Sequence, residues 1–97
     1  MTILRYYEMR ARDGCERHLP AALADLAAQV VPLPGCDGAD FYRDPGDPAL
    51  FVFIERWDSI DAHRLAGAML GKHAFAPVMA ALSGPPSGRY LEPASGA

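Results

Sequence analysis

The stretch LFVFIERW, residues 50–57, decides the fold because it is apolar on both faces of an expected strand. Side chains along a strand point alternately to opposite faces, so the stretch divides into two sets. One face carries Phe51, Phe53, Glu55 and Trp57, and the other carries Leu50, Val52, Ile54 and Arg56. A strand that is apolar on both faces has to be covered on both faces. The stretch therefore predicts a strand with helices on one side and further protein on the other.

Three further strands and three helices are expected around this strand. Strands are predicted over residues 3–11, 38–44 and 88–92, and the cluster Pro45-Gly46-Asp47-Pro48 predicts a turn before the central strand. Helices are predicted over 16–31, from an Asp58 or Ser59 cap through Ala66, and over 72–83. Gly67 and Gly71 bracket residues 68–70, which are expected to be flexible.

The first of these helices carries the clearest helical pattern. Its apolar residues recur at the spacing of one helix face, and they are Leu19, Leu23, Leu26, Ala27 and Val30. Pro20 is tolerated if it lies in the first turn, where its missing N–H has no acceptor in any case.

The resulting order, β-α-β-β-α-β, predicts an α+β, ferredoxin-like fold: an antiparallel sheet with helices on one face. We expect a single domain over residues 1–93 and a loose tail over 94–97. Helices on one side leave the second sheet face bare, and 51% of the residues are hydrophobic. A homodimer that pairs through the sheet face would cover this surface.

The composition of the chain predicts which classes of partner and which cellular compartment to expect. The formal net charge is −3 and the arginines are scattered, which disfavours nucleic-acid binding. No apolar run approaches the ~20 residues that a membrane span needs. The N-terminal sequence MTILRYYEMR leads directly into a strand without a signal-peptide pattern, so Cys15 and Cys36 are expected to be free thiols in a reducing cytoplasm.

Three segments resemble the antibiotic biosynthesis monooxygenase family: FVFIERW-DSIDAHRLAG, the upstream LPGC, and KHAFAPVMAAL-SGPPSGRYLE. The strand that ends in Glu-x-Trp, followed at once by a capped helix with a histidine, is the most specific part. The resemblance implies a dimeric α+β barrel that includes small quinol oxygenases, and oxidation of a bound phenol or quinol by O₂ without flavin or metal. It also implies a pocket between sheet and helices, a tryptophan at Trp57 and, in several members, an asparagine on a strand. This sequence contains no asparagine, so that residue does not carry over.

His63, Trp57 and Glu55 are the candidate catalytic residues. Histidine is a suitable general base near neutral pH, and a deprotonated hydroxyarene can pass an electron to O₂ directly. Trp57 either lines the pocket or is simply core. A half-buried Glu55 would have a raised pKa suitable for a base, and its alternative role is a salt bridge to an arginine on a neighbouring strand.

Five further residues are candidates for substrate binding: Tyr6, Phe53, Met69, His73 and Phe75. Alternation places Tyr6 and Tyr7 on opposite strand faces, one toward the pocket and one toward the dimer interface, without deciding which. His63 and His73 lack the spacing of helix-borne ligands, so no metal site is expected.

The main hypothesis is a cofactor-independent monooxygenase that acts on a small aromatic phenol or quinol. One alternative is a non-catalytic domain that binds a small hydrophobic molecule. Another is a related barrel enzyme that isomerises or decarboxylates cyclic carbonyl compounds without O₂.

Overall fold

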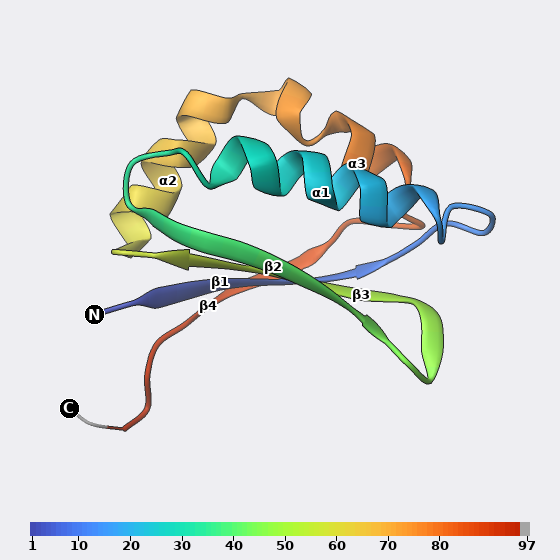
Figure 1. The fold of residues 1–97 in the computed structure, drawn as a ribbon, viewed down its shortest axis with the longest axis horizontal. Coiled ribbons are helices and arrows are strands. Elements are labelled where there is room, and N and C mark those ends of the chain that lie inside the picture. Colours follow the sequence, from blue (N-terminus) through green and yellow to red (C-terminus); the bar gives the residue numbers. More distant parts are fainter. Residues whose placement is uncertain (96–97) are drawn as a thin grey trace.

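A computed structural model describes residues 1–95, and they form two layers. A four-stranded antiparallel sheet makes one layer, and all the helices lie on one of its faces (Figure 1). The strands are β1 (Ile3–Arg10), β2 (Cys36–Asp44), β3 (Asp47–Trp57) and β4 (Ser87–Leu91), in the spatial order β2-β3-β1-β4. This arrangement confirms the predicted ferredoxin-like α+β fold. Within the expected tail, residues 96–97 lie outside the described part.

The strand register determines which side chains meet on the helix-covered face. Arg5 of β1 lies opposite Glu55 of β3 on one side and opposite Tyr90 of β4 on the other. Two positions along, Tyr7 lies opposite Phe53. These side chains point toward the helices, because Phe53 and Glu55 on this face are buried and residues two apart on a strand share a face.

Three α-helices and one 3₁₀ turn cover that face. They are α1 (His18–Val30), α2 (Ile60–Leu70), a 3₁₀ turn (Lys72–Ala74) and α3 (Ala76–Ala80). The predicted α1 stripe is confirmed, since Leu19, Leu23, Leu26 and Val30 are buried. The core lies between this stripe and β3, where Phe51, Phe53 and Trp57 are at most 2% exposed.

Several predicted boundaries were wrong. The expected flexible segment 68–70 is helical, because α2 continues through Gly67 and ends only where Gly71 adopts a φ of +74°. The single helix expected over 72–83 is divided into the 3₁₀ turn and the short α3, with Pro77 near the start of α3. The turn is also shorter than expected, because β3 already begins at Asp47.

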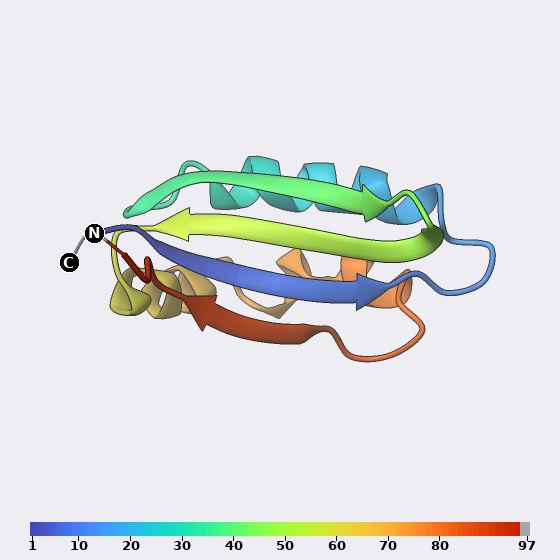
Figure 2. The ribbon, with the colours of Figure 1, turned by 90° about the horizontal axis from the view of Figure 1, so that it is seen from below.

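No helix covers the other face of the sheet (Figure 2). Its central side chains, including Tyr6, Val52 and Ile54, are only half-buried in the single chain. No helix within residues 1–95 is long and apolar enough to cross a membrane. Cys15 and Cys36 are both free thiols in the described structure.

Candidate active site

His63 of α2 is held between two tyrosines of the sheet. Its Nδ1 lies 2.6 Å from the hydroxyl oxygen of Tyr90, and its Nε2 lies 3.1 Å from the hydroxyl oxygen of Tyr7. The Trp57 ring packs edge-on at 5.6 Å between ring centroids. Ser59 fixes the start of the helix, because its hydroxyl accepts a hydrogen bond from the backbone N–H of Ala62. The imidazole therefore has a defined orientation on a capped helix.

Glu55 lies beside the imidazole and is almost completely buried. It is 2% exposed, and its Oε1 accepts a hydrogen bond from the Trp57 indole N–H at 2.9 Å. The same oxygen lies 3.7 Å from His63 Nε2. The salt bridge to an arginine considered from the sequence is not formed among residues 1–95, although Arg5 lies directly opposite in the register. The structure gives Glu55 a tryptophan partner instead.

Burial shifts both titratable groups toward their neutral forms. Burial lowers the pKa of His63 to about 4, with smaller contributions from the positive charges of Arg5 and Arg64. Burial also raises the pKa of Glu55, an effect that the Trp57 hydrogen bond and Arg5 partly offset. The 3.7 Å contact between His63 and Glu55 is therefore not an ion pair at neutral pH. His63 is a neutral base there.

A neutral imidazole between two hydroxyls forms a continuous hydrogen-bonded chain. One ring nitrogen carries a hydrogen and donates, while the other accepts, so one tyrosine is a donor and the other an acceptor. The pKa of Tyr7 is raised, chiefly by burial and then by Glu55, so this hydroxyl keeps its proton at neutral pH. The chain Tyr7–His63–Tyr90 can thus take up a proton at one end and release one at the other.

The structure brings His63, Trp57 and Glu55 together, but it places the five substrate-binding candidates in different parts of the fold. Phe53 is completely buried beneath Tyr7, with ring centroids 6.4 Å apart, and Phe75 packs half-buried against the core. His73 is exposed in the 3₁₀ turn. The Tyr6 ring lies on the helix-free face under Arg89, so it is Tyr7 that joins the cluster.

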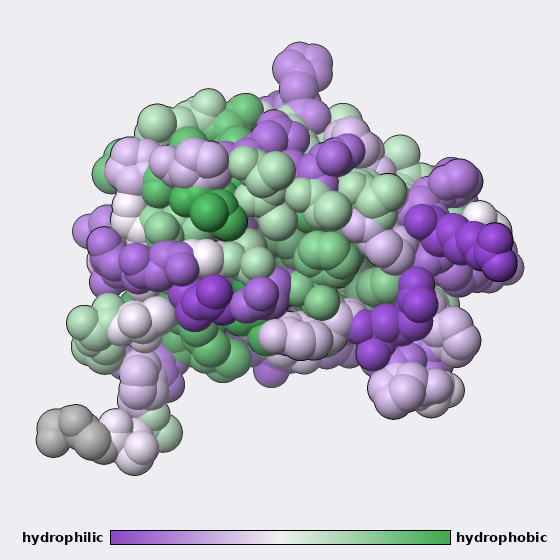
Figure 3. All heavy atoms as spheres, viewed as in Figure 1, coloured by the Kyte–Doolittle hydropathy of each residue, from purple (hydrophilic) through white to green (hydrophobic). Residues whose placement is uncertain are grey.

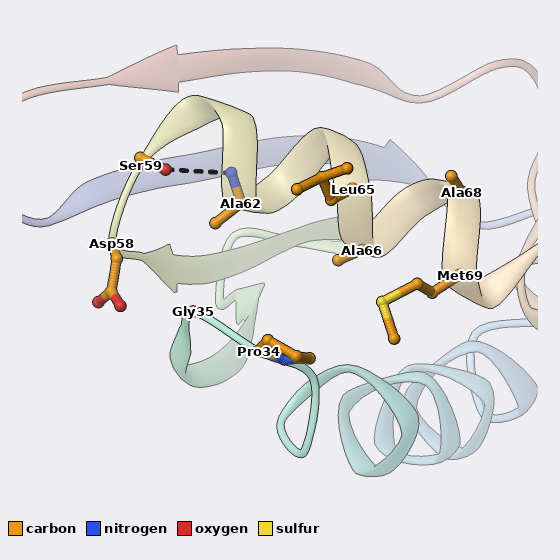
Figure 4. A pocket seen from close by; sticks show the side chains of 9 residues that line it. All are labelled: Pro34, Gly35, Asp58, Ser59, Ala62, Leu65, Ala66, Ala68 and Met69. Atoms are coloured by element: carbon orange, nitrogen blue, oxygen red, sulfur yellow. Dashed lines mark hydrogen bonds between the residues drawn. The ribbon is translucent and has the colours of Figure 1, made fainter.

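Met69 lies in an open groove of about 610 Å³ on another side of α2. Figure 4 shows this groove between α2 and the loop that joins α1 to β2, with the Met69 side chain directed toward it. On the face that carries α1 and β2, Figure 3 shows hydrophobic atoms gathered near the end of α1. Asp58 and Ser59 are the only polar side chains among the groove's lining residues. The groove can bind an apolar surface, whereas the titratable side chains Glu55 and His63, whose pKa values are shifted by burial, lie in the other cluster.

Sequence reasoning missed two members of this cluster, Arg5 and Tyr90, and left Tyr7 as an undecided alternative to Tyr6. Alternation showed that Arg5 and Tyr7 share a face, but it could not show that this face meets the helices. Tyr90 lies in a five-residue strand with too few apolar residues to show a pattern. The alternation of Glu55 and Trp57 along the central strand was the signal that located the site.

The chain matches the model of one protein family over most of its length. The model of the family described as "Antibiotic biosynthesis monooxygenase" matches residues 2–66. A search among curated proteins found no match.

Three solved structures illustrate the similarity in fold. A protein of Chloroflexus aurantiacus, solved as a candidate antibiotic biosynthesis monooxygenase, is 25% identical, with a TM-score of 0.80 over 100% of this chain and 97% of that one. SnoaB, a cofactor-independent oxygenase from Streptomyces nogalater solved as an asparagine-to-alanine variant, is 15% identical, with a TM-score of 0.82 over 98% and 95% of the two chains. Rv0793 from Mycobacterium tuberculosis is 21% identical, with a TM-score of 0.77 over 100% and 99%.

Proposed function

Because the chain belongs to the antibiotic biosynthesis monooxygenase family, we propose that it is a cofactor-independent monooxygenase that oxidises a small aromatic phenol or quinol with O₂. The observation that carries the proposal is the neutral imidazole of His63, oriented by Tyr7 and Tyr90 beside a buried carboxyl. SnoaB, a structural neighbour, is a cofactor-independent oxygenase, which supports the same kind of chemistry here.

In the proposed reaction the proton of the substrate hydroxyl passes to His63 through the hydroxyl of Tyr7 or Tyr90, which occupy its two ring nitrogens. The resulting phenolate is electron-rich and gives one electron to O₂, and the radical pair then combines at the ring carbon opposite the hydroxyl. The hydroperoxide loses water, so one oxygen atom enters the ring and the other leaves as water. A phenol with a free para C–H and one O₂ thus become one quinone and one water. His63 returns its proton to the departing oxygen, and the base is restored.

The surroundings of His63 suit this sequence of steps. Trp57 is 1% exposed and Glu55 2% exposed, so water has little access to the side of the imidazole that they cover. A dry site protects a reactive phenolate and its radical from side reactions. In this proposal Glu55 supports the base, Phe53 supports the Tyr7 ring from beneath, and the half-buried Phe75 is the apolar residue open to the substrate ring.

We further propose that the working unit is a homodimer joined through the helix-free sheet face. Tyr6, Val52 and Ile54 are half-buried there in a single chain, and a second copy would remove them from water. In this arrangement Tyr6 belongs to the interface.

A second candidate function is the binding of a small hydrophobic molecule without catalysis. The sequence has no asparagine, and the apolar groove beside α2 has a volume of about 610 Å³. Such a protein would bind aromatic compounds and leave them unchanged.

Product analysis under isotopically labelled O₂ tests the proposal. Purified protein is incubated with a panel of phenols and quinols, each first shown to bind, and the products are analysed by mass spectrometry. We expect one labelled oxygen atom in the quinone. An anaerobic arm identifies an isomerase or decarboxylase, which would convert substrate without O₂. No conversion of any bound compound in either arm would indicate the binding protein.

A further inference from the structure

Arg5 occupies an unusual place next to the proposed base. Its guanidinium carbon lies 4.4 Å from the centroid of the Tyr90 ring and 5.0 Å from that of Tyr7. These are the two tyrosines that hold His63. The Arg5 Nε atom is buried, and it has no hydrogen-bond partner among the described residues. A buried N–H without an acceptor costs about 1–3 kcal/mol, so such a group calls for a functional reason.

The positive charge of Arg5 also has no carboxylate partner at ion-pair distance among the described residues. Within residues 1–95 no carboxylate oxygen lies within 4.0 Å of its guanidinium nitrogens, although Glu55 is its partner in the register. Burial favours the neutral form of Glu55, and His63 is neutral near pH 7. Arg64 of α2 adds a second positive charge near the imidazole. Charges taken out of water are normally paired, so an anionic oxygen at hydrogen-bond distance from the guanidinium would stabilise this site.

Gly88 of β4 leaves the space that the guanidinium occupies. A Cβ at this position would lie 2.7 Å from Arg5 Nη2 and 3.1 Å from two ring carbons of Tyr7. Gly88 is exposed and belongs to an edge strand, so the guanidinium lies near an open side of the sheet. Arg5 is only half-buried, so part of its side chain remains accessible to a ligand.

We propose that Arg5 binds the hydroxyl oxygen of the substrate and stabilises its ionised form, and thereby selects acidic hydroxyarenes, which lose their proton in the site. This inference rests on the proposed function, because it names the substrate class of that site. The guanidinium supplies charge and several N–H donors, and the Tyr7 and Tyr90 rings hold it in place. The oxygen held by Arg5 is the one from which His63 takes the proton, since both residues contact the same two tyrosines. Neutral aromatic compounds without an acidic hydroxyl are bound more weakly.

The test uses para-nitrophenol, which is yellow only as the phenolate and titrates near neutral pH. An opposite charge at close range lowers the pKa of an acid by about 1–3 units. We therefore expect the bound phenol to titrate about one pH unit lower than the free phenol, which corresponds to a roughly tenfold preference for the phenolate. In Arg5→Met this shift disappears and phenolate affinity falls about tenfold, while Arg5→Lys retains part of the shift.

Two further variants keep the test decisive. Arg43→Met is the matched control, because Arg43 also stacks on an aromatic ring, 5.0 Å from the centroid of Phe51, but lies exposed on β2. It should keep the wild-type shift. If Arg5→Met does not fold, Gly88→Ala displaces the guanidinium without removing it, and it should also weaken phenolate binding.

The inference is overturned if wild-type protein binds the phenol and the phenolate equally well, or binds neither. It is also overturned if the folded Arg5 variants bind the phenolate as tightly as the wild type does. If Arg5→Met does not fold, wild-type phenolate affinity in Gly88→Ala overturns it instead. Failure of the oxygenase proposal is a separate result, since it would appear as absent turnover with the titration shift intact.

Discussion

His63 Nδ1 and the Tyr90 hydroxyl oxygen are 2.6 Å apart, and this contact joins helix α2 to the edge strand β4. The corresponding contact from Nε2 to Tyr7 is longer, at 3.1 Å. Tyr90 is thus the closer of the two groups that orient the imidazole. The strand that carries Tyr90, β4, has only five residues, so the orientation of the base depends on a short element.

Tyr90→Phe removes this hydroxyl and keeps the ring. We expect kcat to fall about tenfold or more with little change in KM, because the base loses the group that fixes its ring and its tautomer. Steady-state kinetics measure both constants. Tyr42→Phe is the control, since Tyr42 is 56% exposed, and it should have wild-type kinetics. Equal losses of kcat in the two variants would contradict the role of Tyr90 in orienting the base.

The pKa of His63 makes folding stability depend on pH. Its value is about 4 in the folded chain against 6.5 as the ordinary value, so between these limits the unfolded state binds more protons. The contribution of His63 to the free energy of unfolding is complete above about pH 6.5 and is lost as the pH falls toward about 4. It amounts to a total on the order of 3 kcal/mol. Glu55 acts in the opposite direction, because its raised pKa favours folding as the pH falls.

Urea denaturation in a Glu55→Gln background isolates the His63 contribution. Adding His63→Gln should flatten the decline in the free energy of unfolding between pH 6.5 and 4. Adding His73→Gln, at an exposed histidine, should leave the decline in place. A slope that is unchanged in the His63 variant would show that this imidazole is not held neutral by the fold.

Gly35 controls how closely the loop before β2 approaches the helix that carries His63. A Cβ there would lie 2.7 Å from the Ala62 Cβ, and its φ is +84°. Gly14 has nearly the same φ, +85°, but open space around it. Gly14→Ala should therefore cost about 1 kcal/mol for backbone strain alone, and Gly35→Ala about 2–3 kcal/mol or more. Chemical denaturation of the two variants gives the difference, and equal losses would contradict the role of this contact.

The helix-free sheet face is expected to join two copies. Ile54 lies near the centre of this face, on the central strand β3. Ile54→Glu would place a charge in the interface and should shift the protein from dimer to monomer in sedimentation at micromolar concentration. Asp61→Lys, on exposed helix surface, changes charge elsewhere and should leave the dimer intact. A folded wild-type monomer would contradict the proposed assembly.

The fold was predictable because its signals are local. The two-faced strand around Phe53, the apolar stripe of α1 and the cap at Ser59 each depend on residues close in sequence. The α2 boundary was missed because Gly67 reads as a helix breaker. It is tolerated in the helix, however, where the cost of a glycine is only about 1 kcal/mol.

The site was only partly predictable, because it depends on pairing between distant strands. Glu55 and Trp57 could be placed together by alternation along one strand. Tyr6 and Tyr7 could not be told apart without knowing which face of β1 meets the helices. Arg5 lies in the cluster only because of its register with β3 and β4. No local pattern carries that information.

O₂ uptake by wild-type protein and a His63→Gln variant, at saturating concentrations of an acidic hydroxyarene, tests the proposed chemistry most directly. If His63 is the base, the wild type consumes O₂ well above the buffer rate, and the variant is at least about 100-fold slower with substrate binding retained. Equal rates in the two proteins, with the compound bound to both, would contradict the role of His63 and the oxygenase mechanism built on it.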